Sequence, residues 1–174
     1  MEEISHTRRV VLDLGSTNTG STRAFFDLRC HCYVEDLNEF IEDIDQTSPS
    51  RFDLLEAHLL DKPDDLKFDY ILCWDIFNYI DQDLQTHLFN LLTPHLKEGT
   101  LLHTIRYTDE FMPAIPGQFK IKSDLTFTMN QDINNNKTNA PVLSTIQMLK
   151  NMSPFNLRST IMNQKGMRKD VTEY

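Results

Sequence analysis

The sequence predicts a single α/β domain built on a mainly parallel, doubly wound sheet whose last strand runs antiparallel. Short apolar runs alternate with stretches of helical periodicity along most of the chain, which is typical of a parallel sheet covered on both faces. Two apolar runs at the C-terminal end are joined by a tight turn, so they must pair as antiparallel strands. The length of 174 residues and the 40% share of hydrophobic residues suit one domain over residues 1–174.

The first third of the chain alternates strand and helix twice. Val10–Leu14 is a short apolar run that ends at Gly15, as a buried strand followed by a loop would. A short helix predicted over Ser21–Leu28 leads to a second strand over Cys30–Val34. Apolar residues then recur at i, i+3, i+4 and i+7 across Leu37–Ile44, which predicts an amphipathic helix.

The middle of the chain contributes three further strands. Phe52–Leu60 is interpreted as a third strand, although its leucine-rich pattern also suits a helix. Phe68–Trp74 is the clearest buried strand of the chain. Leucines at helical spacing predict a helix that begins after Asp81, whose carboxylate suits an N-cap. Thr100–Tyr107 completes the set as a fifth strand.

The last third begins with residues 109–139, which are expected to form an irregular insertion or lid with a strand inside Leu125–Met129. Pro141–Met152 is predicted as a helix with Pro141 near its first turn. Phe155–Met162 and Met167–Glu173 are predicted as the two strands of the final hairpin. There is no internal repeat and no long linker.

The composition of the chain indicates which kinds of binding partner and which cellular compartment to expect. The net charge is −9, and a protein that binds the phosphate backbone normally carries a basic excess, so no nucleic acid is expected. No apolar run approaches the roughly 20 residues of a membrane helix. Three cysteines cannot all pair internally, and the acidic start lacks a signal-peptide stretch, which favours a cytoplasmic location. Cys30 and Cys32 face the side of a strand opposite to His31, so no metal site is expected.

Four segments of the chain occur in an order and spacing that are found together in one enzyme family. They are Val11–Gly15, Glu35–Asp36, Phe68–Asp75 and Leu92–Leu102. Together they resemble the class I S-adenosylmethionine-dependent methyltransferases over nearly the whole chain. The resemblance implies a Rossmann-like sheet of seven strands, with S-adenosylmethionine as the cofactor. It also implies methyl transfer to an acceptor that is a small molecule or a protein.

The same resemblance assigns residues to a site at the carboxyl ends of the parallel strands. It places the loop after the first strand near the amino-acid portion of the cofactor, the acids after the second strand near the ribose hydroxyls, and a histidine near the adenine. The implied cofactor-binding residues are Asp13, Gly15, Thr17, Gly20, Glu35, Asp36, His58, Trp74 and Asp75. The implied acceptor-binding residues are Phe77, Tyr79, Arg106 and Tyr107. No residue is assigned as catalytic.

The loop after the first strand departs from the family pattern, which is an acid followed by Gly-x-Gly-x-Gly. Thr17 and Thr19 stand at the second and third glycine positions, and Gly20 falls one place late. A second hypothesis is therefore a methyltransferase-like scaffold or interaction module without cofactor. The run Asp13–Gly20 also resembles the first phosphate loop of the actin and sugar-kinase ATPases. This third hypothesis requires a second strand that is hairpinned onto the first.

Two features suggest protein partners. The exposed strand of the C-terminal hairpin predicts pairing with a second copy of the chain as a homodimer. A partner chain could also cover the cofactor site, in place of the insertion over residues 109–139. Four basic residues on this hairpin suit an acidic partner protein: Arg158, Lys165, Arg168 and Lys169.

Overall fold

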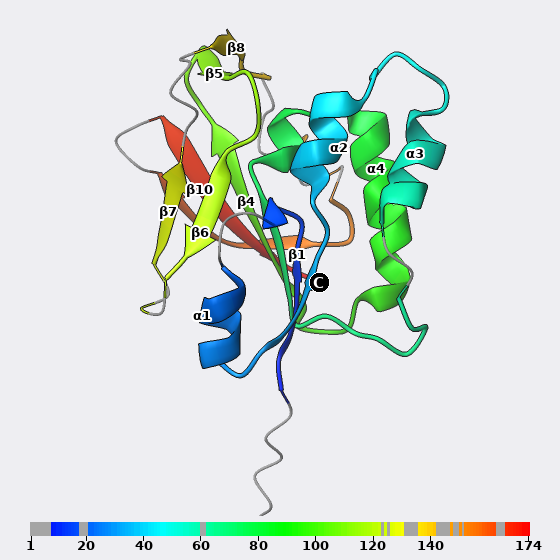
Figure 1. The fold of residues 1–174 in the computed structure, drawn as a ribbon, viewed down its shortest axis with the longest axis vertical. Helices are drawn as coiled ribbons and strands as arrows, with labels where there is room; N and C mark the ends of the chain where they lie inside the picture. The colour runs from blue at the N-terminus through cyan, green and yellow to red at the C-terminus, as the bar shows by residue number, and fades with distance from the viewer. Residues whose placement is uncertain are drawn as a thin grey trace, which may run out of the picture.

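The computed structural model is a mixed α/β structure with one large sheet at its centre (Figure 1). It describes residues 8–17, 21–59, 62–122, 124, 126–130, 136–141, 147, 150, 152–162 and 166–174. The predicted α/β class with a mainly parallel sheet is confirmed. Among the helices that are described, none combines the length and the apolar character needed to cross a membrane.

The central sheet has six strands in the order β2-β1-β3-β4-β10-β9. Their bounds are Val10–Asp13 for β1, His31–Val34 for β2, Tyr70–Trp74 for β3, Leu101–Tyr107 for β4, Asn156–Met162 for β9 and Met167–Glu173 for β10. The first four are mutually parallel, and β10 is antiparallel to both β4 and β9, as the predicted hairpin requires. Parallel pairing of β1 with β2 is incompatible with the hairpin of an actin-type ATPase loop, so that hypothesis is wrong.

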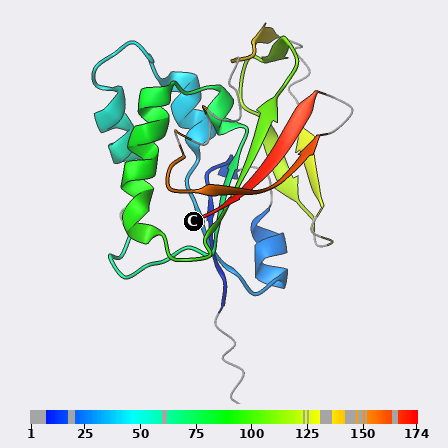
Figure 2. The ribbon, with the colours of Figure 1, turned by 180° about the vertical axis from the view of Figure 1, so that it is seen from behind.

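Helices and a hairpin cover the two faces of this sheet. The helices are α1 (Thr22–Asp27), α2 (Leu37–Asp43), α3 (Arg51–His58) and α4 (Gln82–Leu92), with short 3₁₀ turns at Ile76–Asn78 and Thr93–His95. Figures 1 and 2 show α2, α3 and α4 on one side of the sheet, and α1 with strands β6 and β7 on the other. The apolar residues of β1, β3 and β4 alternate between these two layers, as a doubly covered sheet requires.

The main core lies between the sheet and helices α2, α3 and α4. Its fully buried side chains include Leu12, Leu37, Leu55, Phe68, Ile71, Leu84, Leu88 and Leu102. The predicted cap at Asp81 is confirmed, since its carboxylate accepts a hydrogen bond of 2.9 Å from the Leu84 amide at the start of α4. That bond satisfies one of the backbone donors that a helix leaves free in its first turn.

The predicted strand over Phe52–Leu60 is wrong, because the chain forms helix α3 there. Leu55 is 1% exposed and packs in the main core, whereas the neighbouring Leu54 is 51% exposed. Partly buried Phe52 and Leu59 stand three residues before and four after Leu55, which is a helical stripe. The described sheet therefore has six strands where the resemblance implied seven.

The insertion predicted as irregular over residues 109–139 contains four short strands. These are β5 (Phe111–Pro113), β6 (Gln118–Ile121), β7 (Phe127–Asn130) and β8 (Lys137–Asn139). They pair as two antiparallel ribbons, β5 with β8 and β6 with β7. The strand expected inside Leu125–Met129 corresponds to β7. Most of the helix predicted over Pro141–Met152 lies outside the described residues.

The burial difference between the two neighbouring leucines of α3 gives a first prediction. Leu55→Ala is expected to lower the free energy of unfolding by about 2–5 kcal/mol, because it leaves a cavity in the main core. Leu54→Ala is the matched control and should change it by roughly 0.5 kcal/mol or less, since its side chain is exposed. Urea denaturation of both variants measures the two values. Equal losses would contradict the helical placement of this segment.

Candidate functional site

The predicted site residues converge because the strands that carry them are parallel. Asp13 ends β1, Trp74 ends β3 and Tyr107 ends β4, while Glu35 and Asp36 directly follow β2. Parallel neighbours place their carboxyl ends at the same edge of the sheet. We call this cluster the strand-end site. Gly20, which the resemblance assigned to the same site, lies outside the described residues.

The centre of the strand-end site is a contact of Trp74 with Asp13 and Gly15, which we call the Trp74 contact. The indole Nε1 of Trp74 donates a hydrogen bond of 2.6 Å to Oδ1 of Asp13, which also accepts one of 3.0 Å from the Gly15 amide. A Cβ atom on Gly15 would stand only 2.6 Å from Cδ1 of Trp74. Only glycine therefore allows the indole to lie this close to the loop.

The backbone of β3 is shaped to make this contact. Leu72 pairs with His103 on β4, but Trp74 pairs with the next residue, Thr104, so the register shifts by one residue at Cys73. Trp74 itself has a positive φ of 47°, which a residue with a large side chain rarely adopts. Both departures occur where the indole turns toward β1. A strained backbone conformation of this kind persists only where the surrounding contacts enforce it.

Aromatic side chains from the β6–β7 ribbon cover the indole. Phe119 on β6 stacks on Trp74 with ring centroids 4.9 Å apart and planes 2° from parallel, and Phe127 on β7 meets it edge-on at 5.7 Å. The imidazole of His103 packs edge-on against it from the strand side at 5.6 Å. These contacts leave Trp74 only 3% exposed. The strand-end site is therefore closed over the indole.

Burial changes the acid–base behaviour of the groups around the indole. Desolvation raises the pKa of Asp13 to about 6, against the opposing effect of its hydrogen bonds from Trp74 and Gly15. Burial lowers the pKa of His103 to about 4, and the nearby Lys169 ammonium acts in the same direction. Neither ring nitrogen of His103 has a hydrogen-bond partner among the described residues. His103 is thus a neutral imidazole under the ribbon at neutral pH.

The two acids after β2 are each bound by other groups of the protein. Asp36 accepts hydrogen bonds of 2.9 Å from both the amide and the hydroxyl of Thr17, and it caps α2. Glu35 is buried and forms an ion pair of 2.7 Å with the buried ammonium of Lys62. His58 lies near them, with Nε2 at 2.8 Å from the backbone oxygen of Asp36, to which it donates. All the predicted cofactor acids thus have protein donors.

Another buried acid, Asp75, ties the insertion to the sheet. Its Oδ2 accepts hydrogen bonds of 3.0 Å from the Tyr107 hydroxyl and from the Gly117 amide, which directly precedes β6. Its Oδ1 has no partner among the described residues. Burial raises the pKa of Asp75 to about 7. The Tyr79 hydroxyl extends this network by donating to the Ile115 carbonyl at 2.8 Å.

Two of the predicted acceptor-binding residues have other partners. Arg106 is buried and donates through Nε and Nη2 to Oδ2 of Asp170 at 2.9 and 2.8 Å, within the β4–β10 pair. Phe77 packs in the main core against Phe89, with ring centroids 5.4 Å apart. Tyr79 and Tyr107 instead meet the insertion at the strand-end site. Of the four, the structure therefore brings only these two tyrosines to the site.

Sequence reasoning missed two residues that complete the site. Lys62 and Phe119 contact predicted site residues from segments that carry no motif of their own. The signal that could have indicated Lys62 is its position in the loop before the Phe68–Trp74 strand, since a basic residue there can pair with Glu35 or Asp36 after the neighbouring strand. Phe119 alternates with polar residues in Gln118–Ile121, which is a weak indication of a strand with one buried face.

Comparison with known proteins defines the class of fold. No family model and no curated protein matches the sequence. A solved S-adenosylmethionine-dependent methyltransferase from Clostridium acetobutylicum is similar over 96% of this chain and 84% of its own, with 15% identity and a TM-score of 0.53. The PH0226 protein from Pyrococcus horikoshii is similar over 98% of this chain and 84% of its own, with 11% identity and a TM-score of 0.56.

A third solved structure carries the cofactor itself. The glycopeptide N-methyltransferase MtfA, complexed with S-adenosylmethionine, is similar over 98% of this chain and 89% of its own, with 12% identity and a TM-score of 0.53. The chain therefore has the fold of the class I S-adenosylmethionine-dependent methyltransferases, as its resemblance implied. At these identities the likeness concerns the arrangement of strands and helices. The chemistry of the site has to be argued from its own residues.

The side chains of the strand-end site are of the types that bind S-adenosylmethionine, but each of them already has a partner within the protein. Carboxylates such as Asp13 and Asp36 suit an ammonium group and a pair of ribose hydroxyls, and the ring of Trp74 suits a sulfonium. In this conformation Asp13 and Asp36 accept from Trp74 and Thr17, and the indole covers Gly15. A ligand that bound at Gly15 would have to displace the indole first.

The close approach at Gly15 gives a second prediction. Gly15→Ala is expected to cost about 1–3 kcal/mol of stability, because the new methyl group meets a stacked indole that has little room to move. The same substitution in a Trp74→Leu background should cost much less. Chemical denaturation of the four proteins in this cycle measures the coupling. Additive effects of the two substitutions would contradict the Trp74 contact.

The buried Asp75 gives a third prediction, on pH. Because its pKa is raised from 3.8 to about 7, its contribution to stability is present in full below about pH 4 and is lost as the pH rises through 7. Asp75→Asn keeps the accepting oxygen for Tyr107 and Gly117 without the charge. The variant should match the wild type near pH 4 and gain stability over it progressively as the pH rises to 8. Thermal melts across this range test this, and parallel curves for the two proteins would contradict it.

Proposed function

We propose that the protein is an S-adenosylmethionine-dependent methyltransferase whose cofactor site is closed by Trp74 when no ligand is bound. The observation that carries the proposal is the Trp74 contact itself. An N–H donor and an aromatic ring of the protein occupy the loop and the acid at the end of β1, where a bound ammonium and sulfonium would be held. The fold supports the same assignment, because it is shared with solved methyltransferases over nearly the whole chain.

When bound, S-adenosylmethionine supplies an electrophilic methyl group, and the protein supplies position and a dry surrounding. Asp13 would hold the amino group that replaces the indole N–H. Asp36 or Glu35 would hold the ribose hydroxyls in exchange for Thr17 or Lys62. The β6–β7 ribbon, fixed through Gly117 to Asp75, excludes water from this region. We propose a small molecule or a protein as the acceptor, since the net charge of −9 disfavours nucleic acid.

Removing only the N–H donor of Trp74 tests the proposal. Trp74→Phe keeps an aromatic ring but loses the hydrogen bond to Asp13, whose net worth is about 1.5–3 kcal/mol for an ionised acceptor. The closed form is thereby weakened, so S-adenosylmethionine and S-adenosylhomocysteine should bind about tenfold more tightly than to the wild type. Isothermal titration calorimetry at pH 8, where Asp13 is ionised, measures both affinities.

Tyr70→Phe is the matched control, because Tyr70 lies at the opposite end of β3 and is exposed. It should leave both affinities unchanged. If wild type, Trp74→Phe and Trp74→Leu all fail to bind either compound at millimolar concentration while remaining folded, the methyltransferase proposal is overturned.

That result would favour a second candidate, a non-catalytic module with the methyltransferase fold. The observation in its favour is that three predicted cofactor acids are bound by Trp74, Lys62 and Thr17 of the same chain. A site that is filled by its own side chains is stable without a ligand. The module would then act through its surface, and its exposed edge strand β9 is one place for a second copy to pair.

A further inference from the structure

A concave region lies at the end of the sheet opposite to the strand-end site. It is a hollow of about 680 Å³ lined by Arg8, Arg9, Phe26, Asp27, Leu28, Arg29 and Cys30. We call it the basic hollow. Arg8 and Arg9 directly precede β1, and Arg29 and Cys30 directly precede β2, so the lining comes from the amino ends of two neighbouring strands. Its volume falls within the range of small-molecule sites.

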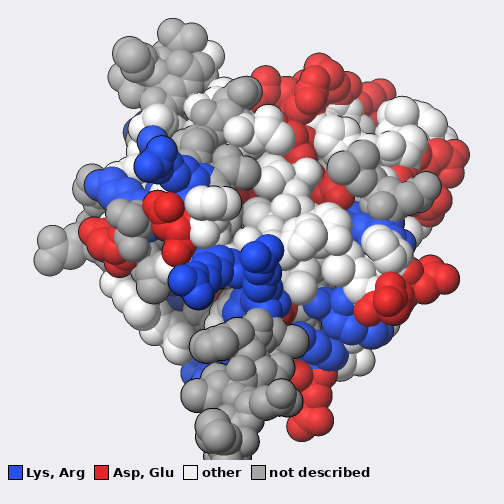
Figure 3. Space-filling view, turned by 60° about the horizontal axis from the view of Figure 1, so that its bottom comes forward, with Lys and Arg blue, Asp and Glu red and all other residues white. Residues whose placement is uncertain are grey.

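The charge of the basic hollow contrasts with that of the whole chain. Three guanidinium groups and one carboxylate line it, whereas the chain carries a net charge of −9. Figure 3 shows this side of the molecule, with Lys and Arg side chains gathered near the middle of the face and most Asp and Glu side chains toward its margin. Guanidinium groups recognise phosphate and carboxylate groups through paired N–H donors. The hollow therefore suits an anion.

The three arginines differ in what already holds them. Arg9 forms an ion pair of 2.8 Å with Asp69, which also binds Lys97, so its guanidinium is fixed at the wall of the hollow. Arg8 and Arg29 are exposed and form no ion pair with another described residue. Arg29 is held by a left-handed turn, with φ of 56°, between α1 and β2. Two guanidinium groups are thus available to a ligand beside one that is fixed.

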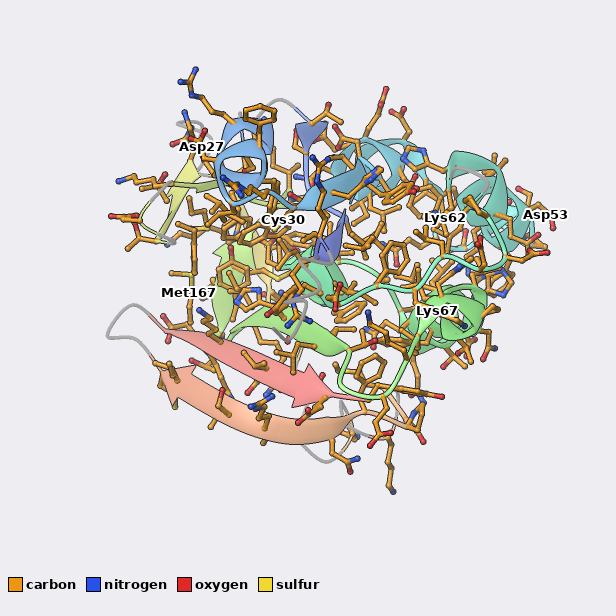
Figure 4. All side chains as sticks on the ribbon, turned by 90° about the horizontal axis from the view of Figure 1, so that it is seen from below. Asp27, Cys30, Asp53, Lys62, Lys67 and Met167 are labelled. Carbon is orange, nitrogen blue, oxygen red and sulfur yellow. The ribbon has the colours of Figure 1, made fainter. Side chains whose placement is uncertain are left out.

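An exposed aromatic ring stands beside these charges. Phe26, in the last turn of α1, is 81% exposed, which is the highest value among the large hydrophobic residues described, and Leu28 is 39% exposed. A phenylalanine this exposed gains no burial from the fold, and its ring offers a surface on which a planar group stacks. In Figure 4 the labelled Asp27, the last residue of α1, and Cys30 lie apart from Lys62 of the strand-end site.

We propose that the basic hollow binds a small phosphate ester with a planar aromatic body, as in a nucleoside monophosphate. Arg8 and Arg29 would bind the phosphate, and Phe26 would stack on the ring. Asp27 limits the affinity for anions because it brings a like charge to the site. This site lies at the amino ends of the strands, so it does not depend on whether the strand-end site binds S-adenosylmethionine.

Titration calorimetry of the full chain with AMP, inorganic phosphate, adenosine and an acidic peptide tests the proposal. Saturable binding of AMP is expected, with weaker binding of phosphate and of adenosine, because each of these two lacks half of the ligand. Binding of phosphate as tight as that of AMP, or of the acidic peptide in place of AMP, would overturn the assignment. So would the absence of AMP binding at millimolar concentration.

Variants of the lining residues sharpen the test. Arg29→Asn, which keeps a residue suited to the left-handed turn, should weaken AMP binding about tenfold, and Phe26→Ala should weaken AMP but not phosphate. Asp27→Asn should strengthen AMP binding, a gain that misfolding cannot produce. Arg23→Gln, on the same helix but outside the lining, is the matched control and should have no effect. Equal affinities in all four variants would overturn the proposal.

Discussion

The hydrogen bond from the Trp74 indole to the Asp13 carboxylate governs how the carboxyl ends of the strands are used. It joins two neighbouring parallel strands, β1 and β3, across the middle of the sheet. The bond requires a glycine at position 15, and it presents a flat ring on which the β6–β7 ribbon packs through Phe119. The sheet, the loop and the insertion thus share one contact, and the burial of Asp13 follows from it.

Elements with a strong local pattern were predictable from the sequence. The strand that ends at Trp74 and the helix capped by Asp81 are both where the apolar spacing and the cap residue placed them. The segment around Leu55 was not, because its leucines suit a strand and a helix equally, and packing against α2 and α4 decides between them. Strand β6 was not predicted, because the burial of Phe119 comes from stacking on Trp74, a residue far away in the sequence.

The sequence predicted which residues lie at the site, but not which groups form hydrogen bonds with them. Asp13 and Asp36 lie at the strand ends as expected, since parallel strands bring such acids together. Their donors depend on tertiary contacts that no spacing encodes. Thr17 shows why a missing glycine was hard to interpret: its hydroxyl and amide both bind Asp36, so the residue that breaks the family pattern also closes the loop.

The alternation of side chains along β3 sets the layer that Trp74 faces, which is the layer of Leu72 two residues before it. Side chains alternate between the faces of a strand, so one residue more or less before the tryptophan would turn the indole to the other layer. Closure of the site is therefore specified by the length of β3 as much as by the identity of its last residue. Inserting or deleting one residue in β3 would therefore open the site by moving the indole to the other face of the sheet, whereas a substitution at position 74 changes only the group that closes it.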